Sequence, residues 1–312
     1  MSRGHVRVCV LVPAFNAERY LREAVASVLR QTVRDLEIVV VDDGSTDRTL
    51  AIARAIPDER VRVVTGPNRG RAHARNAGFA AATPSAYVAL LDADDVWDAD
   101  KLETQLAFLE QNPDVVAVGC FMRYIASTGR TLGETGQTID TVDLQRIARG
   151  ELSPFPISSC VLVDRNAYAA IGGFDASLRE AEDLDFLARL ARRGRIACVP
   201  VVLGSYRIHP ESAMAQHRYR VNRYARFVQE RLASAARGDT LTWDEFSATH
   251  HPTVRERYRD RTEYWYRSAA LWHGEGRPFR AFGYAALAAV TAPTYTLRRL
   301  YRQRLAVASH RH

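Results

Sequence analysis

The sequence predicts an α/β protein with a Rossmann-like, mostly parallel sheet flanked by helices and followed by a helical C-terminal extension. Two observations support this class. Segments with strand patterns alternate with segments of helical periodicity through the first half of the chain, as in sheets whose parallel strands are joined by helices. The runs 6–12, 36–41 and 87–91 are also largely apolar, as expected of strands covered on both faces.

The remaining elements of the first half follow from local patterns. Asn16 can cap a helix whose apolar residues recur at helical spacing up to Leu29. A second helix is predicted over 46–55, a short strand over 61–64 and a third helix over 71–82. An amphipathic helix over 100–111 ends at Asn112 and Pro113, because proline cannot continue a helix.

The second half has fewer regular patterns. Strands are predicted over 158–163 and 196–203 with a helix over 182–193 between them, while the Gly- and Thr-rich stretch 128–137 is predicted to be a mobile loop. From residue 212 onward the pattern is helical and rich in arginine. We therefore expect an α/β domain over 1–212 and a helical, Arg-rich extension over 213–312.

Composition and cysteine usage are those of an ordinary globular protein, with 47% hydrophobic and 25% charged residues. The four widely spaced cysteines form no zinc motif, so a reducing, cytosolic setting is expected. The start of the chain does not have the pattern of a signal peptide, and no apolar stretch is long enough to span a bilayer.

The net charge of +7 comes mainly from the C-terminal region, where residues 255–311 contain 12 Arg against four acids. A solvated helical surface would explain this surplus, and so would attraction to an anionic membrane or acceptor. No nucleic-acid-binding motif accompanies the charge, so nucleic acid is not expected as a partner.

Polar residues follow three predicted strands at the points where the strands end. These segments are Pro13-Ala14-Phe15-Asn16, Asp42-Asp43-Gly44-Ser45 and Asp92-Ala93-Asp94-Asp95. In open α/β sheets, ligands collect beyond the carboxyl ends of the strands. Three carboxylates in four residues repel one another unless a cation joins them, and oxygen ligands suit Mn²⁺ or Mg²⁺. The third segment therefore predicts a metal-bound diphosphate, with a capping cluster or a solvated loop as the alternative.

Glu182 and Asp183 stand at the start of a predicted helix that ends in Arg192 and Arg193. The helix dipole favours acids at the start and bases at the end, and this preference alone can explain the pattern. The functional alternative is that an acid at this helix start is a general base, kept ionised because the helix N-terminus lowers its pKa. The sequence contains no GxGxxG or GxxxxGK[ST] motif, which argues against dinucleotide-dependent oxidoreductases and P-loop enzymes.

Residues 6–212 as a whole resemble the family 2 glycosyltransferases, which are inverting enzymes with the GT-A fold. The resemblance rests on seven segments in the family's order, namely 10–16, 37–47, 70–78, 90–97, 172–175, 182–183 and 206–209. It implies that residues 1–212 bind a nucleotide-diphosphate sugar, with a UDP-sugar as the expected donor. The sugar would pass with inversion to an acceptor hydroxyl, in the synthesis of cell-surface polysaccharide or glycolipid.

The resemblance also implies roles for single residues. Donor-binding residues would be Pro13, Phe15, Asn16, Glu18, Asp43, Arg71, Asp92 and Asp94, with Asp43 at the base of the nucleotide. Asp94, Asp95 and His209 would hold Mn²⁺ or Mg²⁺, although His209 can equally be a surface histidine before Pro210. Asp183 would be the catalytic base, with Glu182 as its neighbour and substitute. Trp97 is either a wall of the site or a core residue.

The partners expected are a nucleotide-sugar donor and a saccharide or lipid-linked acceptor, whose pocket the loop 128–156 would shape. The segment 279–305 combines the apolar stretch 285–290 with Arg298, Arg299, Arg302 and Arg304, which suggests contact with an anionic membrane surface. A helical cap or an oligomer contact is the alternative for this segment. The enzyme would then be cytoplasmic and work at the inner face of the membrane.

Two rival functions are compatible with these patterns. A nucleotidyltransferase that makes a nucleotide sugar would share the fold and the metal. It normally carries a Gly-rich phosphate loop with a catalytic Lys or Arg, which is absent here before Arg19. The other rival is a non-catalytic nucleotide-sugar-binding subunit, and the intact Asp94, Asp95, Asp183 and His209 argue against it.

Overall fold

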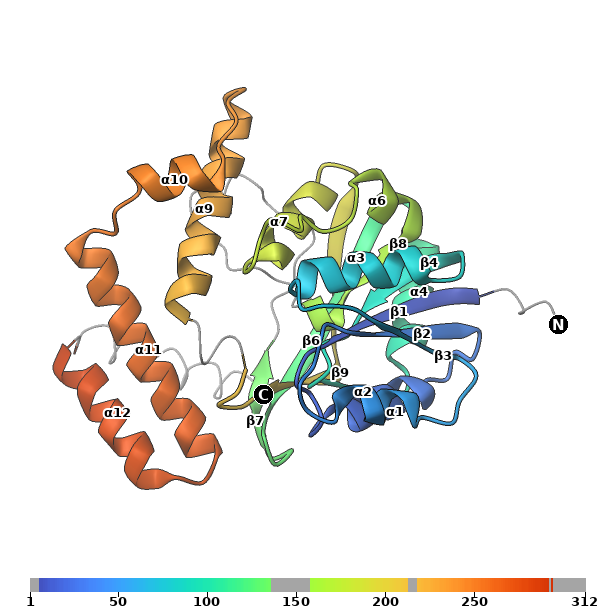
Figure 1. Cartoon of the computed structure of the whole chain (residues 1–312), viewed down its shortest axis with the longest axis horizontal. Coiled ribbons are helices and arrows are strands. Elements are labelled where there is room, and N and C mark those ends of the chain that lie inside the picture. The colour runs from blue at the N-terminus through green and yellow to red at the C-terminus, as the bar shows by residue number, and fades with distance from the viewer. Residues whose placement is uncertain (1–5, 136–157, 213–217, 292, 294–312) are drawn as a thin grey trace. The chain divides into compact units, whose positions relative to one another are not determined.

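A computed structural model describes residues 6–135, 158–212, 218–291 and 293 (Figure 1). The strands are β1 (Val6–Ala14), β2 (Leu36–Asp42), β3 (Val61–Thr65), β4 (Ser85–Leu90), β5 (Val96–Trp97), β6 (Val115–Ala126), β7 (Thr131–Thr135), β8 (Leu162–Asp164) and β9 (Arg195–Ile208). The helices are α1 (Leu21–Leu29), α2 (Thr49–Arg54), α3 (Arg71–Ala81), α4 (Lys101–Gln111), α6 (Arg165–Ala170), α7 (Glu182–Leu190), α9 (Arg218–Ala236), α10 (Trp243–Thr249), α11 (Val254–Gly274) and α12 (Pro278–Thr291).

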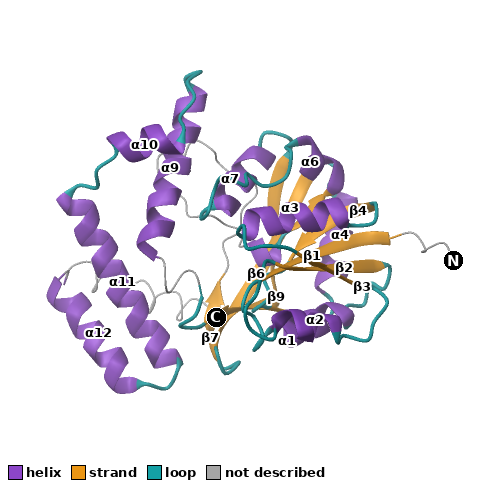
Figure 2. Cartoon of the chain, viewed as in Figure 1, coloured by secondary structure: helices purple, strands orange, loops and turns teal. Residues whose placement is uncertain are grey.

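The described strands form one sheet in the order β3-β2-β1-β4-β8-β6-β9-β5, and β7 pairs with β6. β1 to β4 run parallel, whereas β8 is antiparallel to both β4 and β6, and β5 is antiparallel to β9. Figure 2 shows α3 on one side of β1 and β2, with α1 and α2 on the other. This double cover explains why β2 is buried along its whole length.

The predicted fold class is confirmed, and most elements of the first half begin and end near their predicted residues. Some predictions in detail are wrong. The stretch 128–137 contains β7 rather than only a loop, and 158–163 begins as a 3₁₀ turn before β8. β6 and α6 were not predicted, although β6 is 12 residues long.

Asn16 does not cap α1, contrary to the prediction. The helix begins after Tyr20, and Asn16 has a φ of 48°, in the left-handed region that Asn tolerates better than most residues. Its side-chain oxygen instead accepts a hydrogen bond from the Thr46 backbone N–H at 2.9 Å. A tertiary contact has therefore replaced the local helix cap.

Helix α3 packs closely on β1 and β2 because Gly78 has no side chain. A Cβ atom there would lie 2.9 Å from Val41 Cγ2 and 3.2 Å from Leu11 Cδ2. Arg71, Arg75 and Gly78 are spaced by four and three residues, so they share one face of the helix. The close packing at Gly78 thus points both arginines toward the end of the sheet where the polar strand ends lie.

The chain divides into two compact units. The first consists of the described residues of Met1–Tyr124, Gly133–Arg207 and Tyr224–Leu241. The second consists of those of Ile125–Leu132, Ile208–Arg223 and Thr242–His312. The functional division predicted at residue 212 stays a prediction.

Within the second unit, α11 and α12 pack side by side as a helical hairpin (Figure 1). Thr253 caps α11 and forms a capping box with Glu256, which satisfies backbone groups at the start of the helix. No helix among the described residues is long and apolar enough to cross a membrane. The predicted membrane segment 279–305 lies outside the described residues from 294 onward, and the predicted acceptor loop does so from 136.

Candidate active site

The loops after β1 and β2 are bound to each other at the carboxyl ends of the strands. The Asn16 backbone N–H donates to Ser45 Oγ at 3.0 Å, and Glu18 Oε2 accepts from the Arg48 backbone N–H at 3.0 Å. The predicted donor ligands Asn16 and Glu18 therefore hold the two loops together. Phe15 is exposed beside them and remains available to a ligand, while Pro13 is buried in β1.

Asp43 fixes the loop that leads into α3. Its two carboxylate oxygens accept from the backbone N–H groups of Arg69 at 2.9 Å and Gly70 at 2.8 Å. Gly70 has a φ of 94°, a conformation that favours glycine. A cavity of about 110 Å³ lies beside Asp43 and is also lined by Val64 and Ala77. Each oxygen keeps a second lone pair, so the carboxylate can also accept from a ligand.

Asp95 is a fully buried acid in the segment that follows β4 in the sequence. Its Oδ1 accepts from the Arg207 backbone N–H at 2.8 Å, and its Oδ2 has no hydrogen-bond partner within the described residues. Burial raises the pKa of Asp95 well above its usual value, and the charges of Asp94 and Asp92 raise it further. A buried carboxylate with an unpaired oxygen is costly, and a bound cation would remove that cost. The predicted metal ligand thus fits a cation.

The described residues contain no group of three or more His, Cys, Asp or Glu side chains arranged to hold a metal ion. An ion at Asp94 and Asp95 would leave coordination positions for water and substrate phosphates, as Mg²⁺ usually does. His209 belongs to the second unit, where its Nδ1 lies 3.0 Å from Glu211 Oε2. Its role as a metal ligand stays a prediction.

Arg207 supports the turn that carries Asp94 and Asp95. Its Nε donates to the Asp94 carbonyl oxygen at 2.8 Å, and its Nη2 pairs with Glu23 Oε2 at 2.7 Å. The guanidinium also lies 4.7 Å from the centre of the Tyr20 ring. Arg207 was not predicted as a site residue, although it falls inside the segment 206–209.

Arg75 connects Asp92, which follows β4, with Glu182 at the start of α7. Its side chain is 1% exposed, with Nη2 2.6 Å from Asp92 Oδ1 and Nη1 2.8 Å from Glu182 Oε1. The guanidinium also lies 4.9 Å from the centre of the Phe174 ring. Burial by itself lowers the pKa of Arg75, but Asp92 and Glu182 raise it, so that the pKa stays above its usual value. Arg75 was not predicted; its position four residues after Arg71 was the available signal.

Glu182 is bound by arginines and is therefore a poor substitute for the base. Its Oε1 lies 3.2 Å from Arg71 Nε in addition to its contact with Arg75, and its side chain is buried. Arg71 also donates to Glu180 Oε2 at 3.1 Å and is partly exposed. The structure thus brings Arg71, Asp92, Glu182 and Asp183 together, with Arg71 at the accessible side.

Ala181 just before α7 has a φ of 58°, which is unfavourable for a residue with a Cβ atom. Such a conformation costs about 1–3 kcal/mol and persists only where the surroundings impose it. The neighbours Glu180 and Glu182 are both bound to Arg71, and these contacts hold the turn in place. The turn sets Asp183 in the first turn of α7.

Asp183 is the acid of this group with fewest contacts. Among the residues that the structure describes, its side chain accepts only from the backbone N–H of the adjacent Leu184, at 2.8 Å. Desolvation by the surrounding protein raises the pKa of Asp183 to about 6, with a contribution from Glu182, while Arg71 and Arg75 oppose the rise. The prediction that the helix N-terminus lowers this pKa is wrong, because desolvation and Glu182 outweigh that effect. Asp183 is still mostly ionised at pH 7.

Trp97 is a core residue and not a wall of the site. Its Nε1 donates to the Ser159 carbonyl oxygen at 2.7 Å, and the side chain is buried. The ammonium of Lys101 lies 3.9 Å from the centre of its ring. The Ser159 hydroxyl oxygen in turn accepts from the Asp92 backbone N–H at 2.9 Å. Trp97 thus helps to position the acidic segment 92–95 through Ser159.

The chain belongs to glycosyl transferase family 2, whose sequence profile matches residues 9–172. An uncharacterized glycosyltransferase of Haemophilus influenzae is 30% identical over 234 residues, which are 71% of this chain and 72% of that protein. This chain spans less of some other curated relatives, such as 33% of an uncharacterized glycosyltransferase of Rickettsia felis and 19% of the chondroitin synthase of Pasteurella multocida. The protein is accordingly a glycosyltransferase.

Solved structures agree on the fold. TarS 1-349 of S. aureus, determined with UDP-GlcNAc, has a TM-score of 0.58 at 17% identity, with 91% of each chain covered. The mannosyltransferase PcManGT of Pyrobaculum calidifontis, determined with GDP-Man and Mn²⁺, has a TM-score of 0.57 at 23% identity. That likeness covers 97% of this chain and 81% of the other. The chain therefore has a GT-A-like fold.

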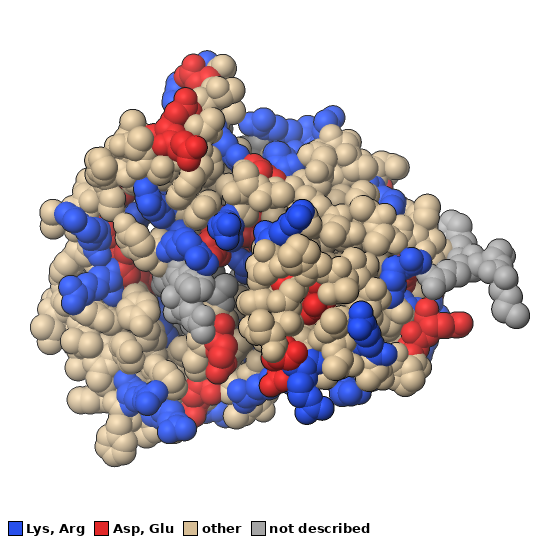
Figure 3. Space-filling model, in the orientation of Figure 1, with Lys and Arg blue, Asp and Glu red and all other residues tan. Residues whose placement is uncertain are grey.

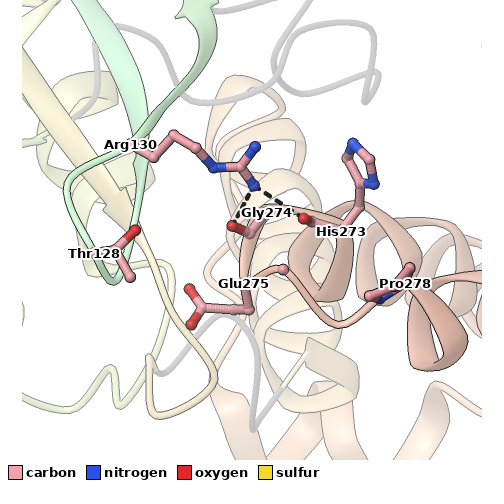
Figure 4. Close-up of a pocket in the computed structure, with 7 residues that line it drawn as sticks. Thr128, Arg130, His273, Gly274, Glu275 and Pro278 are labelled. Atoms are coloured by element: carbon pink, nitrogen blue, oxygen red, sulfur yellow. Dashed lines mark hydrogen bonds between the residues drawn. The ribbon is translucent and has the colours of Figure 1, made fainter.

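The second unit has a separate cavity of about 450 Å³ beside the turn between α11 and α12 (Figure 4). Arg130 Nη2 donates to the carbonyl oxygens of His273 at 3.0 Å and Gly274 at 2.5 Å, at the end of α11. Glu275 accepts from the Ser127 backbone N–H at 2.9 Å. These contacts satisfy carbonyl groups at the helix end and fix the turn from which α12 starts. None of the predicted donor, metal or catalytic residues lines this cavity, whereas Thr128 and Arg130 belong to the segment predicted to shape the acceptor pocket.

The buried bridge at Arg75 predicts a large loss of stability on its removal. Arg75→Met should lower the free energy of unfolding by about 3–5 kcal/mol, because Glu182 is left as a buried charge without this partner. Urea unfolding measures the change. Arg60→Met is the matched control, since it breaks the partly exposed pair with Asp58 and should cost about 0–1 kcal/mol. Equal effects of the two substitutions would contradict the role assigned to Arg75.

Proposed function

We propose that this glycosyltransferase moves a sugar, in a single displacement with inversion, from a nucleotide-diphosphate sugar to an acceptor hydroxyl, with Asp183 as the base. The observation that carries the proposal is the environment of Asp183. Among the described acids near Arg71 and Arg75, only Asp183 is both partly exposed and without an arginine partner; Asp92, Glu180 and Glu182 each pair with one of these arginines. Its pKa of about 6 is close to the ideal for a base that works near neutral pH.

The proposed reaction needs one proton acceptor and one leaving group. Asp183 takes the proton of the acceptor hydroxyl while the hydroxyl oxygen forms a bond to the anomeric carbon. The bond between that carbon and the diphosphate oxygen breaks on the opposite face, and a nucleoside diphosphate leaves. Arg71 is partly exposed next to Asp183 and is suited to meet the negative charge of the donor.

Asp94 and Asp95 are the proposed ligands of Mn²⁺ or Mg²⁺. The buried, unpaired Oδ2 of Asp95 and the adjacent Asp94 carboxylate supply the oxygen chemistry that such an ion prefers. When bound, the ion would neutralise charge on the diphosphate as a Lewis acid. His209 is proposed as a further ligand on the strength of its family segment alone.

The donor is proposed to be a UDP-sugar, whose base would lie near Asp43 with Phe15 and Pro13 beside it. The cavity next to Asp43 and the exposed ring of Phe15 support this placement. TarS was determined with UDP-GlcNAc and PcManGT with GDP-Man, so nucleotide sugars are bound by proteins of similar fold. Asn16 and Glu18 are proposed to shape the nucleotide loop indirectly, and Glu182 to position Asp183.

The acceptor is proposed to be a saccharide or a lipid-linked saccharide of a cell-surface polysaccharide or glycolipid. The enzyme would act in the cytoplasm, at the inner face of the membrane, with residues 213–312 providing acceptor, membrane or oligomer contacts. The support for this placement is the arginine surplus of the C-terminal region. In the view of Figure 3, basic side chains are spread over α11 and α12.

Replacing the proposed base should abolish most turnover without affecting donor binding. Asp183→Asn keeps the shape of the side chain but cannot accept the proton, so kcat should fall by about 10²–10⁴-fold. Donor affinity, measured by isothermal titration calorimetry, should change little. Asp100→Asn is the control, because Asp100 is exposed and its side chain caps no helix. Full activity in the Asp183 variant would show that the base is another residue.

The pKa of Asp183 predicts how activity depends on pH. Only the ionised carboxylate accepts a proton, so kcat/KM should be retained above about pH 6 and fall about tenfold per pH unit below it. A fully solvated aspartate, with its ordinary pKa of 3.8, would give this loss only in much more acidic solution. Arg71→Gln should move the midpoint to higher pH, because Arg71 lowers the pKa of Asp183. A pH–rate profile that is flat between pH 5 and 7 would contradict the assignment.

Metal removal provides a further test with two readouts. Turnover should disappear in EDTA and return with Mn²⁺ or Mg²⁺. In thermal-shift measurements, Mn²⁺ should increase the stabilisation that UDP gives to the wild type, because a ligand stabilises the folded state according to its affinity. Asp95→Asn should lose that increase. Undiminished turnover in chelator would argue against a metal at Asp94 and Asp95.

A further inference from the structure

Helix α12 exposes one apolar side along its whole length. Phe279 is 93% exposed, Phe282 76%, Leu287 46% and Val290 83%. At 100° per residue these four side chains fall on one side of the helix. Ala281 and Ala288 lie on the opposite side and are buried. The helix is thus packed in its unit through small residues, and its large apolar side chains face outward.

Single exposed apolar residues are normal, but a continuous stripe of large ones marks an interaction surface. We call the stripe of Phe279, Phe282, Leu287 and Val290 the α12 face. Between the two phenyl rings at one end and the two aliphatic side chains further along, that side of the helix carries Gly283, Ala286 and Ala289, and Arg280 lies at its edge beside Leu287. The partner of this face must therefore be apolar over the length of the helix.

The charge around the α12 face distinguishes between partners. Among the described residues from 276 to the end of α12, Arg277 and Arg280 are the charged side chains, and there is neither Asp nor Glu. A second copy of the chain would bring the same positive charge to the contact and would be repelled. An anionic lipid surface offers negative head groups next to an apolar layer, so it complements both the arginines and the stripe.

The second unit holds α12 in a fixed position for such a contact. The turn before the helix is fixed by Glu275, which binds Ser127, and by Arg130, which binds the end of α11. Arg277 lies at the start of α12, and Arg280 stands over the Trp272 ring at 4.7 Å. With 14 residues the helix is too short to span a bilayer, and lying in the interface suits its length and its one-sided pattern.

We infer that the α12 face inserts into the boundary between head groups and acyl chains of an anionic membrane, with α12 parallel to the surface. This rests on the proposed membrane contact and gives it a defined surface. It does not depend on which sugar is transferred, and vesicle binding can be measured without donor or acceptor. Failure of the inference would leave the assignment of Asp183 untouched, and failure of that assignment would leave the inference untouched.

The test is co-sedimentation of the full chain with vesicles. Wild-type protein should bind vesicles of phosphatidylglycerol and phosphatidylcholine, and bind phosphatidylcholine alone at least about tenfold more weakly, because each arginine near an anionic surface adds a few-fold to binding. The double substitution Phe279→Ser with Phe282→Ser should weaken binding to the anionic vesicles by about tenfold or more, because both rings lose their burial in lipid. Arg277→Gln should weaken it about fivefold.

The control is Val254→Ser, which removes a 75% exposed apolar side chain at the start of α11 in the same unit. It should bind vesicles as the wild type does. Three results would overturn the inference. They are no binding of the wild type, equal binding of the wild type and the double variant, and a lower melting temperature of the double variant without lipid. The last would show that the face is covered within the protein or by a second copy, and sedimentation velocity separates these two cases.

Discussion

The candidate site depends on one interaction, the burial of the Arg75 guanidinium between Asp92 and Glu182. A buried charge is tolerated only when it is paired and hydrogen-bonded, so each of the three groups requires the others. Asp92 follows β4 and is next to the proposed metal ligands, whereas Glu182 starts α7 and precedes the proposed base. Because the two acids come from distant parts of the chain, Arg75 sets the distance between the donor side and the base side of the site.

The same pairing separates the roles of acids that look alike in the sequence. Glu182 is buried and forms ion pairs with two arginines, whereas Asp183 accepts one backbone hydrogen bond and has a raised pKa. A raised pKa at one of two adjacent acids is typical of acid–base sites. Asp95 has no arginine partner of this kind. Burial and two neighbouring acids raise its pKa, so a cation bound beside it would be favourable. One buried arginine and one buried carboxylate therefore organise most of the electrostatics.

The packing that supports this arrangement comes largely from residues outside the reacting groups. Gly78 lets α3 lie close to β1 and β2, which brings Arg71 and Arg75 to the strand ends. Ala181 adopts a left-handed conformation that the flanking glutamates hold through Arg71. Arg207 and Ser159 support the turn of Asp94 and Asp95 from β9 and from the 3₁₀ turn. Each contact limits the freedom of a side chain proposed to touch the donor or acceptor.

The sequence by itself determined the α/β class, the order of the first strands and helices, and the segments that carry the acids. It could do so because periodicity, β-branched runs and proline stops act over a few residues. It did not predict β6, the left-handed Asn16, the Arg75 bridge or the raised pKa of Asp183. Only the tertiary structure decided these, because burial and ion pairing depend on which distant segments meet. Local propensity describes a residue's neighbours in the chain, whereas charge pairing and desolvation depend on its neighbours in space.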